Sequence, residues 1–135
     1  MIKKLVAPLS FYKLTNLAEE TKNMNLEKAY IEFNENSFEF AEYDHINTLF
    51  IKTLLNDMTC LYDHGRKVFL NDILRAIGLD IIPEGWNYGL MKGKTISPNE
   101  LNVDYSGKYV KIYLKGLIPA EQIFKGTEKT FIKED

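Results

Sequence analysis

The stretch Lys67-Val-Phe-Leu-Asn-Asp-Ile-Leu-Arg-Ala-Ile-Gly-Leu-Asp80, with Gly85-Trp86 five residues further on, decides the fold of this chain. Its pattern predicts a short apolar strand, an Asn71 N-cap, a helix of about two turns and a Gly78 stop. We expect the only tryptophan and Phe69 to be core residues that pack against the helix upstream. The stretch offers no nucleophile, acid–base pair or ligand cluster, so it specifies structure and not chemistry.

Upstream of this stretch, residues 44–62 carry the most regular helical pattern in the chain. Asp44 is the expected N-cap, and His64-Gly65 is the expected end, because glycine readily adopts the left-handed conformation at a helix terminus. Cys60 is expected to be a buried, unreactive thiol. Apolar residues recur at three- and four-residue spacing, which predicts one core-facing side. The members of that side are Ile46, Leu49, Phe50, Thr53, Leu54, Met58 and Leu61.

Alternation of apolar and polar residues predicts strands elsewhere in the chain. Residues 29–33 and 37–41 alternate around Asn34-Glu-Asn36, a pattern typical of a β-hairpin. Trp86 and Tyr88 indicate another strand. The clearest strand, over residues 109–115, directs three side chains to the core: Val110, Ile112 and Leu114. Together these elements predict an α+β fold, in which a small antiparallel sheet packs against one long helix and one or two short helices.

The length indicates a single domain over residues 1–135, large enough to bury roughly two thirds of its unfolded surface. We expect residues 1–9 to form an arm, and Ser10 to cap a helix over residues 11–18. Charge dominates residues 125–135, which are expected to form a mobile tail.

Composition excludes several classes of protein. A net charge of −2 argues against a dedicated nucleic-acid binder, so we expect no direct sequence-specific contact with nucleic acid. The single cysteine excludes an intrachain disulfide framework. No apolar run approaches the ~20 residues of a membrane span, and no signal peptide is visible. We therefore expect no membrane partner and no secretion by a signal peptide.

The spacing of the candidate catalytic and ligand-binding residues argues against each apparent motif. His45 and His64 lie near opposite ends of the long helix, roughly 28 Å apart, so they cannot share a metal ion. Gly89-Leu-Met-Lys-Gly-Lys-Thr95 has one residue too few between its glycines for a phosphate-binding loop. Glu32 and Glu39 are expected to be solvent-facing strand residues, although pairing of surface carboxylates stays open. We expect no catalytic residue, no metal and no cofactor.

The aromatic residues are the strongest candidates for binding. Tyr109 and Tyr113 are expected to share the wet side of a strand with lysines, where tyrosine offers a large contact area at little cost in entropy. Ordinary surface tyrosines and the stacking of nucleic-acid bases are the alternatives. The expected partner-binding residues are Tyr105, Tyr109, Lys111, Tyr113 and Lys115.

Packing motifs follow one another in a fixed order from residue 68 onward. They are Val68-Phe-Leu-Asn-Asp, Gly78-Leu, Gly85-Trp86, the strand 109–114 and Gly116-Leu-Ile118. In this order they resemble an uncharacterised protein family of tailed bacteriophages and prophages of gut bacteria. The resemblance covers residues 50–124, while the first 45 residues have no counterpart. Because that family has no established chemistry, the resemblance implies a phage origin and transfers no catalytic residue.

We therefore expect a non-enzymatic phage protein that acts through protein–protein contacts as a structural component of the virion. The expected partners are other phage structural proteins or copies of the chain itself, and the expected location is the virion or the host cytoplasm. Two alternatives stay open. One is a phage-encoded inhibitor of a host defence system, similar to an anti-CRISPR, which would bind a host defence protein. The other is a small hydrolase.

Overall fold

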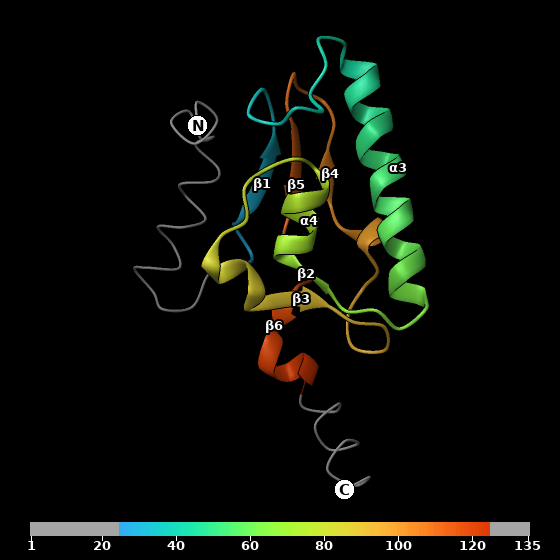
Figure 1. Cartoon of the computed structure of the whole chain (residues 1–135), viewed down its shortest axis with the longest axis vertical. Helices are drawn as coiled ribbons and strands as arrows, with labels where there is room; N and C mark the ends of the chain where they lie inside the picture. Colours follow the sequence, from blue (N-terminus) through green and yellow to red (C-terminus); the bar gives the residue numbers. More distant parts are fainter. Residues whose placement is uncertain (1–24, 125–135) are drawn as a thin grey trace, which may run out of the picture.

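The structure, a computed structural model, describes residues 25–124 (Figure 1). These residues form two three-stranded antiparallel sheets with one long helix and shorter helices, which confirms the α+β fold. Three sequence-based expectations lie outside the described residues: the arm over residues 1–9, the helix over residues 11–18 and the tail over residues 125–135.

The first sheet has the strand order β1-β5-β4, with β1 Tyr30–Phe33, β5 Val110–Tyr113 and β4 Val103–Asp104. Both neighbours run antiparallel to the central strand, and Ile31 lies opposite Ile112. One side of β5 is buried as predicted, because Val110, Ile112 and Leu114 are each at most 2% exposed.

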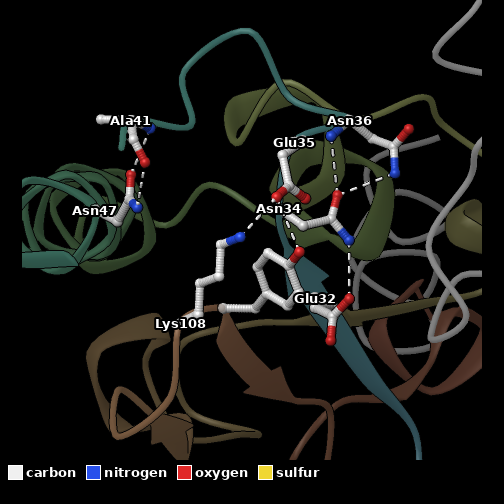
Figure 2. Close-up of polar contacts among 8 residues, drawn as sticks. Glu32, Asn34, Glu35, Asn36, Ala41, Asn47 and Lys108 are labelled. Atoms are coloured by element: carbon white, nitrogen blue, oxygen red, sulfur yellow. Dashed lines mark hydrogen bonds and ion pairs between the residues drawn. The ribbon is translucent and has the colours of Figure 1, made fainter. Parts of the chain in front are cut away.

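The predicted hairpin around residues 34–36 is wrong, because β1 pairs with β5 and residues 37–41 form no strand. Side chains in this segment form hydrogen bonds with backbone groups, and these bonds hold the chain away from β1. Asn34 Oδ1 accepts the backbone N–H of Asn36 at 2.9 Å (Figure 2). Ser37 Oγ donates to the carbonyl of Ile77 at 2.6 Å. The chain after β1 is thereby held at Ile77 instead of turning back along β1.

The long helix, α3, spans Asp44–Asp63 and runs along one side of the described chain in Figure 1. Asp44 is not its cap, because the N-cap position is Tyr43 and no side chain bonds the first-turn amides. The predicted end is confirmed, since Gly65 has a φ of 91° directly after His64.

The predicted core face of α3 is wrong by a rotation of about 100°, the step of one residue. Asn47 is 1% exposed, and its amide bonds both the N–H and the C=O of Ala41, as Figure 2 shows. This polar anchor fixes which side of the helix is buried. Only Met58 belongs to both the predicted and the observed core face. The observed face consists of Asn47, Ile51, Leu55, Met58 and Tyr62.

The second sheet has the order β2-β3-β6 and lies below the first sheet in Figure 1. Its strands are β2 Val68–Phe69, β3 Tyr88–Leu90 and β6 Ile118–Pro119. The predicted strand through Trp86 therefore begins later, because Pro83–Trp86 is a short 3-10 helix, η1. A second 3-10 helix, η2, spans Pro98–Glu100. Residues 120–124 are helical.

The short helix α4, Leu70–Ala76, follows β2 directly. The prediction that Asn71 caps this helix is wrong. Asp72 instead accepts the N–H of Phe69 at 2.8 Å. Asn71 is fully buried, and its amide exchanges two hydrogen bonds with the backbone of Ile82. The motif residue thus joins α4 to the segment that leads to η1.

Both sheets, α3 and α4 share one hydrophobic core. Its fully buried side chains come from every layer of the fold, which makes residues 25–124 a single packed unit. The largest are Phe33, Ile51, Leu70, Ile73, Leu74, Ile77, Leu90, Ile112, Leu114 and Ile123.

Candidate functional site

The expected partner-binding residues do not form one surface. Lys111 and Tyr113 do lie together, half-buried on the outer side of β5. The Lys111 ammonium is 5.4 Å from the ring centroid of Tyr30, and the rings of Tyr30 and Tyr113 are 5.5 Å apart. Tyr30 was not among the expected residues, although its place opposite Tyr113 follows from the register of β1 and β5. The alternation in β1 was the signal that could have found it.

Tyr109 precedes β5 and bonds the turn after β1. Its hydroxyl donates to Glu35 at 2.9 Å, and Lys108 pairs with the same carboxylate at 3.3 Å, as Figure 2 shows for Lys108 and Glu35. Slight desolvation raises the pKa of Glu35, but hydrogen bonds from its own backbone N–H, Tyr109 and Lys108 outweigh it, so the pKa lies below its usual value. The hydrogen bond to Glu35 raises the pKa of Tyr109. The Tyr109 hydroxyl is therefore already bonded within the chain.

Tyr105 lies apart from the other expected residues, and Lys115 forms an ion pair. Tyr105 is half-buried beside α3, where the Lys52 ammonium is 5.3 Å from its ring centroid. Burial raises the pKa of its hydroxyl. Lys115 pairs with Glu27 at 3.7 Å. Participation of the five residues in partner binding stays a prediction, and it would involve at least two separate places on the surface.

A cavity of about 450 Å³ opens between α3 and the segment around η2. Four of its lining side chains contact one another, since Asn99 donates to Asn56 at 2.6 Å and Lys52 lies over Tyr105. The lining residues are Lys52, Leu55, Asn56, Asn99, Leu101, Asn102, Val103 and Tyr105.

Trp86 is 42% exposed, so the prediction that it is a core residue is wrong. The buried member of the Gly-Trp pair is Gly85, because a Cβ at this position would overlap the Asn71 amide. Trp86 is left on the surface, where its ring meets Phe69 at 6.0 Å, and Phe69 stacks on Phe124 at 5.8 Å. Phe69 is only half-buried. Sequence reasoning missed this cluster because it assigned every large aromatic of the motif to the core.

The side of α3 that was expected to be buried is largely exposed. We call this side the outer face of α3; it comprises Ile46, Leu49, Phe50, Thr53, Leu54 and Leu61. Ile46, Leu49 and Leu61 are 43%, 64% and 46% exposed, while Phe50 and Leu54 are half-buried at its edge. Cys60 is also exposed, contrary to the expectation of a buried thiol. The helix therefore exposes Ile46, Leu49 and Leu61 beside its buried side, while Phe50 and Leu54 pack against the edge of the core.

Within residues 25–124, no three His, Cys, Asp or Glu side chains gather as metal ligands. The Gly89–Thr95 segment is partly strand β3 and partly an exposed turn. Lys92 donates to the carbonyl of Asp63 at 3.0 Å and Lys94 to that of Gln122 at 2.7 Å. Both lysines donate to carbonyl groups of helical residues. A positive charge is favourable at the carboxyl end of a helix.

No protein-family model, curated protein or solved structure matches this chain. In the part of the chain that the structure describes, no helix combines the length and apolar character that crossing a bilayer requires. The resemblance to phage proteins therefore rests on its motifs alone.

Proposed function

We propose that the chain is a non-catalytic phage protein that acts through protein–protein contacts, as a structural component of the virion that first assembles with copies of itself. The observation that carries this proposal is the outer face of α3. Large apolar side chains on a helix surface cost free energy in water unless a partner covers them, and contiguous apolar patches mark interaction sites. The origin in a phage rests on the sequence resemblance.

A second copy of the chain is the partner that fits the outer face of α3 best. Ile46 and Leu61 lie equally far along the helix from its midpoint at Thr53-Leu54. Two antiparallel copies related by a two-fold axis would place Ile46 of each opposite Leu61 of the other. Such self-complementarity is what an isologous interface requires. Asp57 is the charged residue within this stripe, so the face carries a single negative charge among its apolar side chains.

Cysteine cross-linking tests this pairing in the full chain. In a Cys60→Ser background, Thr53→Cys lies beside the proposed axis, and we expect mild oxidation to yield a disulfide-linked dimer. Leu61→Cys in the same background is the matched control. It lies on the same face, but its two copies would be about 22 Å apart along the helix and should not cross-link.

The proposed pairing would be contradicted if the Thr53→Cys variant stayed monomeric under conditions that oxidise an exposed thiol. Cross-linking at position 61 in place of position 53 would equally exclude the antiparallel arrangement. Mass spectrometry of purified phage particles tests the virion role directly, since a structural component must be present in them. No observation on residues 25–124 favours the inhibitor or the hydrolase.

A further inference from the structure

Three aromatic side chains from distant segments form one surface beside the second sheet. Phe69 ends β2, Trp86 ends η1, and Phe124 lies in the helical turn after β6. Phe69 is at the centre, with the Trp86 ring edge-on at 6.0 Å and the Phe124 ring stacked at 5.8 Å. Trp86 is 42% and Phe124 39% exposed. Single exposed aromatics are ordinary, but three rings in a row, each in contact with the next, form a continuous apolar surface.

A cation lies at each end of this surface. The Arg75 guanidinium is 5.7 Å from the centroid of Trp86, and the Lys67 ammonium is 5.7 Å from the centroid of Phe124. The order is therefore Lys67, Phe124, Phe69, Trp86, Arg75, which we call the aromatic row. Tryptophan and arginine are the residues most enriched in the energetic centres of protein interfaces.

Neither cation has a carboxylate partner among the described residues. The ion pairs within residues 25–124 are Lys108–Glu35 and Lys115–Glu27. Asp72, on the same helix as Arg75, accepts the backbone N–H of Phe69 instead. Both ends of the aromatic row are thus positively charged groups that can still accept a charged partner.

We propose that the aromatic row binds an acidic peptide segment of another protein, in which carboxylates flank a large apolar side chain. The apolar side chain would cover the rings, and the carboxylates would pair with Lys67 and Arg75. An arginine fork matches a carboxylate in two hydrogen bonds, which fixes the register of the segment. This inference rests on the proposed role as a binding protein, but it concerns a surface other than the outer face of α3.

Single-stranded nucleic acid is the other chemistry that exposed rings and cations attract. Its binding requires a basic groove that follows several phosphates, whereas this row has one cation at each end and the chain carries a net charge of −2. A short acidic segment matches this charge distribution more closely.

Selection from a library of random linear peptides against the full chain tests the proposal. We expect the enriched peptides to carry acids on both sides of an aromatic or branched aliphatic residue. Because Trp86 is the chain's only tryptophan, its fluorescence reports binding at the row itself. Addition of a selected peptide should shift the Trp86 emission to shorter wavelength, and Trp86→Ala should abolish the enrichment.

The double variant Lys67→Gln/Arg75→Gln should bind a selected peptide about tenfold or more weakly than the wild type, equivalent to about 1.4 kcal/mol of binding free energy. Lys28→Gln/Lys92→Gln removes the same charge elsewhere and should change the affinity by less than about twofold. The proposal is overturned by the absence of enriched peptides, by enriched peptides that are basic or uncharged, or by enrichment that Trp86→Ala retains. Tight binding of oligo(dT) that quenches Trp86 would assign the row to nucleic acid. None of these results alters the cross-linking expected at Thr53→Cys, so the two proposals fail separately.

Discussion

At Gly85 the absence of a side chain decides how the central motif packs. The Asn71 amide occupies the space that a Cβ at position 85 would need, and the same amide bonds both backbone groups of Ile82. The sequence pattern identified Asn71, Gly85 and Trp86 as the residues that specify this region. It could not assign their roles, because the contact between positions 71 and 85 is tertiary. The polar residue is buried and the tryptophan is on the surface, the reverse of their usual preference.

Gly85→Ala should lower the free energy of unfolding by about 2 to 3 kcal/mol, because the added methyl group displaces the Asn71 amide and leaves buried groups unpaired. Urea denaturation measures this difference. Gly107→Ala is the matched control, since the nearest atom to its Cβ would be 3.9 Å away. An equal loss in both variants would contradict the packing described for Gly85.

Trp86→Ala should cost only about 1 kcal/mol, the size of an aromatic contact on the surface. Ile73→Ala, which opens a cavity at a fully buried position, should cost about 2 to 5 kcal/mol. Thermal or urea denaturation of the two variants compares them directly. If Trp86→Ala is as damaging as Ile73→Ala, the ring is a core residue after all.

At the scale of elements, the existence and the C-terminal end of α3 could be predicted, but its N-cap and its orientation could not. Helical spacing and the His64-Gly65 stop are local signals, and the structure bears them out. The core-facing side depends on Asn47, whose partner Ala41 lies before the helix. Because apolar residues also lie beside the buried side of α3, periodicity alone selected the more continuous set. The hairpin prediction failed similarly, since the Ser37 hydroxyl donates to the distant carbonyl of Ile77, directly after α4.

Asn47→Leu tests this anchor. Leucine suits a buried position by volume, but it would leave the N–H and C=O of Ala41 unpaired, so we expect a loss of about 1 to 3 kcal/mol. His45→Leu, at an exposed position two residues away, should change stability by no more than about 0.5 kcal/mol. Chemical denaturation of both variants provides the measurement. A neutral or stabilising Asn47→Leu would contradict the role of the amide.

At the scale of the whole molecule, Glu35 connects the turn after β1 with the segment before β5. Strand β5 and its alternation were predictable because its pattern is local, whereas its pairing with β1 joins segments about eighty residues apart in sequence. The position of Tyr105 away from Lys111 and Tyr113 was not predictable for the same reason. Lys115, Tyr105 and Tyr109 find partners on other elements, which alternation within one strand cannot reveal.

The Glu35 contacts should make stability depend on pH. Because the folded pKa of Glu35 is lowered, its contribution is fully present above the unfolded pKa and is lost as pH falls through the folded pKa. The stability difference between the wild type and Glu35→Gln should therefore shrink between about pH 6 and pH 3, around the ordinary glutamate pKa of about 4.3. Urea denaturation at a series of pH values measures it. Tyr109→Phe should reduce the pH dependence, and a constant difference would exclude these contacts as its source.

Sedimentation velocity of the full chain across a wide range of concentration tests the central claim, that the protein works by contact through the outer face of α3. We expect the wild type to pass from monomer to dimer as concentration rises. Ile46→Glu/Leu61→Glu should stay monomeric with an unchanged far-UV circular dichroism spectrum, because both side chains point away from the core. A wild type that remains monomeric at every concentration, or a double variant that dimerises as the wild type does, would contradict the account.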